Sequence, residues 1–111
     1  MPLDLSVLDT LVDHDAAKLR KYSLLFIASL EEMLAQVDDG MARADCALLG
    51  AMGHRAKSTA LNIGATGFST QCLRMEQAAT AHDTAAAMAL AHSLRPMFLP
   101  IRAALLHHLE A

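Results

Sequence analysis

The chain has 111 residues, close to the commonest size of one domain, so we predict a single domain over residues 1–111. Hydrophobic residues make up 54% of it, with many Ala, Leu and Met and few aromatic side chains, which favours helix over strand. The net charge of −3 lacks the strong basic excess of a general nucleic-acid-binding protein, so we expect no nucleic-acid partner.

The amino-terminal sequence Met-Pro-Leu-Asp-Leu-Ser has no basic stretch followed by an apolar run, so we predict no signal peptide. No apolar run approaches the roughly 20 residues of a membrane-spanning helix, which predicts a cytoplasmic protein with no membrane partner. Cys46 and Cys72 both fall in apolar helical patterns. We interpret them as small buried hydrophobic residues in a reducing compartment, with a disulfide or a thiol site as the alternative.

In chain order, the first predicted element is a short helix over about 5–12, with Asp4 as a candidate N-cap. A second helix is expected to start after Asp13 or Asp15 and to end near residue 37, where an Asp-Asp-Gly sequence follows. The apolar residues of this second helix recur at spacings of three and four, the signature of an amphipathic helix. They are Leu19, Tyr22, Phe26, Ile27, Leu30, Met33, Leu34 and Val37.

The third predicted helix covers about 41–63, with Leu49, Ala56 and Ile63 on its apolar seam. Gly64 is suited to end this helix, because glycine accepts the left-handed conformation of a helix terminus. We expect a fourth helix from Thr66, as its cap, to about residue 79.

The last predicted helix covers about 83–109 and contains Pro96 and Pro100. A proline inside a helix removes one hydrogen bond and clashes with the preceding turn, at a cost of about 3 kcal/mol. We therefore expect a kink or a break there, with helix on both sides. No segment alternates as a strand would, so the predicted fold is all-α: an antiparallel four-helix bundle with a short additional amino-terminal helix.

Residues 53–64, Gly-His-Arg-Ala-Lys-Ser-Thr-Ala-Leu-Asn-Ile-Gly, carry the most informative pattern. His54 and Lys57 are three apart, which places an imidazole and an ammonium group on one helix face. Gly50 and Ser58 lie one turn before and after His54, and both are small, so another protein can approach the ring closely. A neutral imidazole is nucleophilic near pH 7, and the adjacent ammonium can pair with an arriving phosphoryl group.

This segment resembles the signature of histidine-containing phosphotransfer domains, in which His is followed after two residues by Lys-Gly, and then by Gly ten residues after the His. His54, Lys57 and Gly64 stand in register with it. Residues 44–49 resemble the lead-in helix of the family, and residues 73–76, Leu-Arg-Met-Glu, resemble its Leu-x-x-Leu/Met-Glu stretch. The family's fold is an antiparallel four-helix bundle.

Two positions depart from the family pattern. Ser58 stands where glycine is usual, and Ala56 stands where a larger apolar residue is common.

The resemblance implies a phosphocarrier in a multistep phosphorelay of two-component signalling. His54 would accept a phosphoryl group from the aspartyl phosphate of a response-regulator receiver domain, or of a hybrid histidine kinase receiver, and pass it to another receiver. Lys57 would stabilise the charge of the phosphoryl group, Glu76 would orient the imidazole, and the Ser58 hydroxyl could hydrogen-bond the phosphate.

The sequence has no glycine-rich nucleotide-binding loop, so we expect no ATP-dependent kinase activity and therefore no enzyme of that kind. No cofactor is expected in this chain, because the Mg²⁺ of the reaction belongs on the receiver.

The alternative function is a non-phosphorylated interaction module of the same fold that binds or inhibits a receiver domain or a histidine kinase. The presence of both His54 and Lys57 favours the carrier.

Spacings typical of metal sites, such as His-Glu-x-x-His, do not occur, so we predict no metal site at the other histidines. These other histidines are His14, His82, His92, His107 and His108.

We expect a monomer, because one bundle accounts for the apolar stripes.

Overall fold

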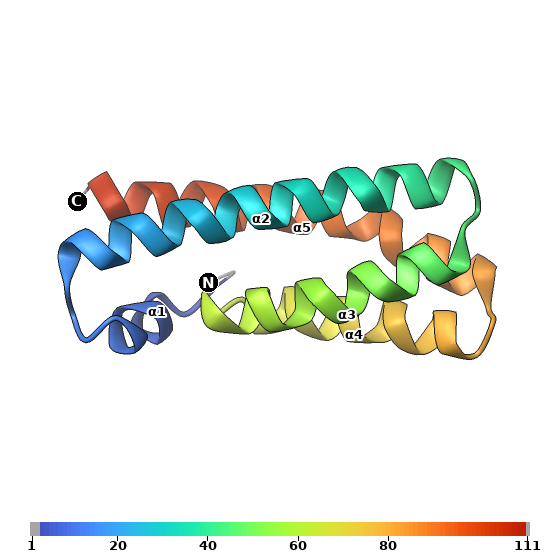
Figure 1. The fold of residues 1–111 in the computed structure, drawn as a ribbon, viewed down its shortest axis with the longest axis horizontal. Helices are drawn as coiled ribbons and strands as arrows, with labels where there is room; N and C mark the ends of the chain where they lie inside the picture. The colour runs from blue at the N-terminus through green and yellow to red at the C-terminus, as the bar shows by residue number, and fades with distance from the viewer. Residues whose placement is uncertain (1–2, 111) are drawn as a thin grey trace.

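The structure, a computed structural model, describes residues 3–110, and over that range it contains five helices and no strand. The all-α prediction is confirmed. Four long helices lie along the long axis of an elongated molecule measuring 42 × 20 × 19 Å, and successive ones run in opposite directions (Figure 1). The helices are α1 (Leu5–Leu11), α2 (Ala16–Ala42), α3 (Cys46–Asn62), α4 (Thr66–Thr80) and α5 (Thr84–Glu110).

The long helices form a closed set of contacts. α3 packs against α2 on one side and most extensively against α4 on the other, while α5 contacts both α4 and α2. The short α1 lies across the end of the molecule where α2 begins and α3 ends (Figure 1). The contact between α3 and α4 is therefore the most extensive in the fold, and these two helices carry the residues of the candidate site.

Aspartate side chains start four of the helices by accepting a hydrogen bond from a backbone N–H of the first turn. Asp4 accepts from the Ser6 N–H, as predicted. Of the two predicted starts of the second helix, Asp13 and Asp15, the structure shows Asp15 as the cap, and it accepts from the Lys18 N–H. Asp45 and Asp83 cap α3 and α5 in the same way.

The fourth helix starts differently from the prediction. Its N-cap is Ala65, with no side-chain hydrogen bond, and Thr66 is already the first helical residue, so the predicted Thr66 cap was wrong. The connection from α3 is tight: Gly64 adopts a φ of +74°, the left-handed conformation expected for it, and its carbonyl oxygen accepts from the Asp4 N–H. Because this turn is so short, the buried Ala65 occupies the capping position.

The predicted end of the second helix near residue 37, and the predicted start of the third at 41, were wrong. α2 continues to Ala42, and α3 begins only at Cys46. Gly40 is buried inside α2, where an added Cβ would lie 2.9 Å from Cδ2 of Leu49. An interior glycine costs a helix only about 1 kcal/mol relative to alanine, and the close α2–α3 packing that it permits outweighs this cost.

The fifth helix is continuous through Pro96 and Pro100, so a break at these residues does not occur. Figure 1 shows that α5 changes direction between its orange first part and its red remainder, which agrees with the expected proline kink. Both prolines are exposed. Water can therefore satisfy the carbonyl groups that lose a helical donor, and this removes the main reason for a break.

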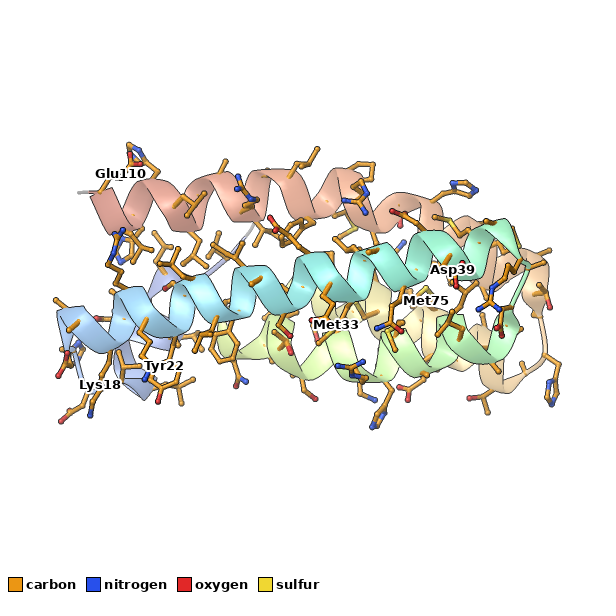
Figure 2. The ribbon with its side chains drawn as sticks, turned by 45° about the horizontal axis from the view of Figure 1, so that its top comes forward. Lys18, Tyr22, Met33, Asp39, Met75 and Glu110 are labelled. Carbon is orange, nitrogen blue, oxygen red and sulfur yellow. The ribbon has the colours of Figure 1, made fainter. Side chains whose placement is uncertain are left out.

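The core is continuous along the molecule and consists mainly of aliphatic and methionine side chains, with the rings of Phe68 and Phe98 6.3 Å apart. The predicted seam of α3 is confirmed, since Leu49, Ala56 and Ile63 are all buried. In Figure 2, Met33 of α2 and Met75 of α4 lie between the helices, and both are buried.

The predicted stripe of α2 has one clear exception. Tyr22 is 37% exposed and lies at the outer end of α2 beside Lys18, where the short α1 leaves it only partly covered (Figure 2).

Both cysteines are free thiols, so the disulfide alternative is wrong. Cys72 is fully buried, as predicted, and Cys46 is half-buried. Burial raises the pKa of the Cys72 thiol to about 12, which keeps the sulfur protonated and unreactive at neutral pH. Across residues 3–110, none of the helices combines the length with the apolar composition that crossing a lipid bilayer requires.

Leu49→Ala tests the phase of α3. Leu49 is fully buried, so we expect truncation to lower the free energy of unfolding by about 2–5 kcal/mol, measured by chemical denaturation. Leu61 lies on the same helix but is 51% exposed, so Leu61→Ala should change stability by no more than about 0.5 kcal/mol. Equal effects of the two substitutions would contradict this placement of the helix.

Candidate functional site

Three of the predicted site residues meet at the α3–α4 contact. His54 and Lys57 come from successive turns of α3, and Glu76 comes from the carboxy-terminal half of α4. The Nδ1 atom of His54 lies 2.6 Å from Oε2 of Glu76, and Lys57 donates from Nζ to Oε1 of Glu76 at 2.5 Å. A single carboxylate therefore holds both residues of the histidine–lysine pair, one with each oxygen.

The three side chains differ sharply in exposure. The side chain of His54 is 67% exposed, whereas those of Lys57 and Glu76 are 26% and 22% exposed. The imidazole thus projects into solvent, with its inner nitrogen anchored to the protein. A second macromolecule can reach this ring without any rearrangement of the helices.

The charge state of Glu76 determines what His54 can do. The hydrogen bond from Lys57 is the main reason that the pKa of Glu76 lies below its ordinary value of 4.5. Partial burial acts in the opposite direction, and the hydrogen bond with His54 adds to the lowering. Glu76 is therefore a carboxylate at neutral pH, and a carboxylate can only accept hydrogen bonds.

It follows that the hydrogen between His54 and Glu76 belongs to Nδ1 of the imidazole. In the neutral ring, the other nitrogen then carries a lone pair and no hydrogen. This nitrogen, Nε2, is the ring atom not engaged by Glu76 in an imidazole that is largely exposed. The arrangement presents one defined nucleophilic atom at the surface of α3.

Ser58 is exposed and lies one turn after His54 on α3. Side chains on a helix lean toward its amino terminus, so the Ser58 hydroxyl leans toward the turn that bears the imidazole. The geometry thus keeps Ser58 beside His54 without involving it in the contacts of Glu76.

Sequence reasoning missed Ser69, a buried residue of α4 whose hydroxyl donates to the main-chain oxygen of Lys57 at 2.9 Å. This hydrogen bond ties α4 to α3 at the level of Lys57. The only signal in the sequence is a serine next to Phe68 on the apolar side of its helix, and helical phase alone does not identify its acceptor.

The remaining histidines are not part of this site. His14 pairs with Asp9 at the α1–α2 connection, with its Nδ1 2.6 Å from a carboxylate oxygen. Within residues 3–110, no three side chains of His, Cys, Asp or Glu gather closely enough to hold a metal ion.

Comparison with solved structures shows a strong similarity of fold. The crystal structure of histidine-containing phosphotransfer protein B from Pseudomonas aeruginosa PAO1 matches this chain with a TM-score of 0.90 and 22% sequence identity. The match covers 98% of this chain and 95% of that chain. The chain has the fold of a histidine-containing phosphotransfer protein.

No protein-family model and no curated protein sequence matches the chain.

Glu76→Gln tests the electrostatics of the site through stability. A carboxyl group whose pKa is lowered in the folded state stabilises the fold above its ordinary pKa, and this contribution is lost as the pH falls through the lowered value. We therefore expect the substitution to cost about 1 kcal/mol at neutral pH, measured by chemical denaturation. The difference from the wild type should shrink once the pH falls below 4.5.

Glu32→Gln is the matched control, because Glu32 is an exposed residue of α2. It should change stability little at either pH. A cost of Glu76→Gln that is the same in neutral and acidic solution would contradict the ionised bridge.

Proposed function

We propose that this chain is the phosphocarrier of a phosphorelay, a four-helix bundle that carries a phosphoryl group on His54. The group comes from the aspartyl phosphate of one receiver domain and passes to the aspartate of another. The observation that carries this proposal is the exposed imidazole of His54, whose Nδ1 is bound by Glu76 and whose Nε2 is left open. The phosphotransfer fold of the chain supports it.

The transfer needs little covalent work from the protein. The Nε2 lone pair of His54 attacks the phosphorus atom in line, the new N–P bond forms, and the bond between phosphorus and the aspartate oxygen breaks. The electrons of that bond leave with the receiver's carboxylate. Because Nδ1 keeps its hydrogen, the imidazole gains positive charge during attack, and the Glu76 carboxylate at 2.6 Å stabilises that charge.

Lys57 has a second role in this proposal. In the unphosphorylated protein its ammonium group is bound to Glu76, on the Nδ1 side of the ring. The flexible stem of lysine lets Nζ leave Glu76 for the phosphoryl oxygens once they arrive. Lys57 then offsets the negative charge that spreads over the transferred group, and the Ser58 hydroxyl donates a hydrogen bond to the same oxygens.

The partners in this scheme are response-regulator receiver domains, including the receiver of a hybrid histidine kinase. The chain works as a carrier, without its own ATP-dependent kinase activity and without a resident cofactor, and the Mg²⁺ of the reaction sits on the receiver. It would act as a cytoplasmic monomer made of one domain. An exposed ring in place of a deep active-site cleft suits this role, since the receiver supplies the rest of the reaction site.

His54→Gln tests the proposed function directly. Wild-type protein is incubated with radiolabelled phosphorylated receiver domains, and separately with phosphoramidate, and the label is followed on gels. We expect an acid-labile label on the wild type and none on His54→Gln, because the nucleophile is missing. His92→Gln is the control, since His92 is an exposed histidine on α5, and it should be labelled like the wild type.

Two outcomes would contradict the carrier. Label that persists on His54→Gln would place the phosphoryl group elsewhere. Tight receiver binding without label on the wild type would favour the non-phosphorylated interaction module.

Lys57→Ala should slow labelling by roughly 10- to 100-fold, because the transferred group loses a neighbouring cation. The helical circular dichroism signal should persist, because the Lys57 side chain lies outside the apolar core and is 26% exposed to solvent. Lys18→Ala provides the control, because Lys18 lies at the far end of α2 beside α1 (Figure 2). Equal labelling rates for all three proteins would remove Lys57 from the mechanism.

A further inference from the structure

Two glycines of α3, Gly50 and Gly53, face α4 where the two helices come very close together. A Cβ atom added at Gly53 would lie 2.6 Å from the carbonyl oxygen of Cys72 and 3.1 Å from the backbone nitrogen of Glu76. At Gly50, one turn earlier, it would lie 2.8 Å from the Cβ atom of Ala79. The distances of 2.6 Å at Gly53 and 2.8 Å at Gly50 are far below ordinary van der Waals contact, so α4 sits where only glycine on α3 allows it.

We propose that Gly53 is a positioning residue for the phosphoryl-accepting site: its missing side chain sets how near the α4 backbone comes, and thereby whether Glu76 reaches His54 and Lys57. This inference rests on the proposed function of His54. According to this proposal, Gly53, which has no side chain, determines through Glu76 which nitrogen of the His54 imidazole is free to react.

The contacts at Gly53 belong to the part of α4 that carries Glu76. Besides the two backbone atoms, the Cβ atom of Glu76 itself would lie 3.4 Å from the added carbon. A carbonyl oxygen and an amide nitrogen inside a helix cannot turn away as a flexible side chain can. Relief of the clash therefore requires α4 to move outward at the level of Glu76, by about 1 Å.

A movement of that size is enough to undo the bridge. Glu76 makes both of its hydrogen bonds across the helix contact, at 2.6 Å to His54 and 2.5 Å to Lys57. A separation of about 3.6 Å is no longer a hydrogen bond. The Ser69–Lys57 hydrogen bond holds α4 against α3 one turn of α3 beyond Gly53. The two helices would therefore separate mainly near Glu76.

Without Glu76, nothing among these contacts would keep the hydrogen on Nδ1 of His54. The neutral ring would then place its hydrogen on either nitrogen, and part of the population would carry it on Nε2, where it blocks attack. We therefore expect Gly53 to control the tautomer of His54 as well as the rate of phosphorylation.

Gly53→Ala and Gly50→Ala form a matched pair for testing this. Each adds one methyl group to the same face of α3, each meets a rigid atom of α4, and each raises intrinsic helix propensity. The nearest atoms differ: they belong to Cys72 and Glu76 in the first case and to Ala79 in the second. Two readouts are needed, the His54 tautomer from nitrogen-15 NMR of the neutral ring and the rate of labelling by phosphoramidate.

For Gly53→Ala we expect loss of the pure Nδ1–H tautomer and labelling slowed about 10-fold or more, with helical circular dichroism retained. For Gly50→Ala we expect the wild-type tautomer and a rate within about twofold of the wild type. A wild-type tautomer in Gly53→Ala, or the same loss in both variants, would overturn the proposal.

Glu76→Asp covers the case in which Gly53→Ala does not fold. This substitution leaves the α3–α4 contact intact and shortens the side chain by one methylene, which draws the carboxylate away from His54. Loss of the Nδ1–H tautomer would support the proposal that the tautomer depends on how far the carboxylate extends toward His54. Retention of the Nδ1–H tautomer would overturn the proposal. The tautomer is measured without any phosphoryl donor. A wild type that shows the Nδ1–H form but takes no label would therefore refute the proposed function and leave the positioning role of Gly53 standing.

Discussion

The site depends on the two hydrogen bonds that the Glu76 carboxylate makes with His54 and Lys57. The carboxylate binds the imidazole of His54 with one oxygen and the ammonium group of Lys57 with the other, across the contact between α3 and α4. Because Lys57 lowers the pKa of Glu76, the carboxylate stays ionised and accepts the Nδ1 hydrogen of His54. One ion pair thus fixes the orientation of the ring, its tautomer and the identity of its outward-facing nitrogen.

This bridge requires two helices to lie unusually close together. The contact between α3 and α4 is lined at successive levels by Gly50 opposite Ala79, Gly53 opposite Cys72, and the Lys57 carbonyl opposite Ser69. Small residues let the backbones approach, and the surrounding core of aliphatic side chains holds them there. The long helices α2 and α5 therefore serve the site indirectly, by giving α3 and α4 a rigid apolar surface to pack against.

The exposed position of His54 matches chemistry that is shared between two proteins. Phosphoryl transfer needs alignment and charge compensation, and in the proposed relay the receiver contributes both the phosphate and its metal ion. In that proposal, this chain contributes the nucleophilic imidazole of His54 and the ammonium group of Lys57, which is bound to Glu76 until the phosphoryl group arrives. Such a division explains why so few polar side chains suffice, and why they lie on the surface of a helix pair instead of inside a cavity.

The sequence by itself determined the helical class, the buried seam of α3 at Leu49, Ala56 and Ile63, and the shared face of His54 and Lys57. These follow from helical periodicity, which is a local property of the chain. The tertiary structure alone decided that α2 continues past Gly40, that α5 stays helical through its prolines, and that Glu76, expected from the family resemblance to orient the imidazole, also binds Lys57. The continuity of α5 depends on the exposure of Pro96 and Pro100, which the packing of the other helices decides. The course of α2 and the contacts of Glu76 depend on the distance between helices, which is set by side chains far apart in the sequence, such as Gly53 and Cys72.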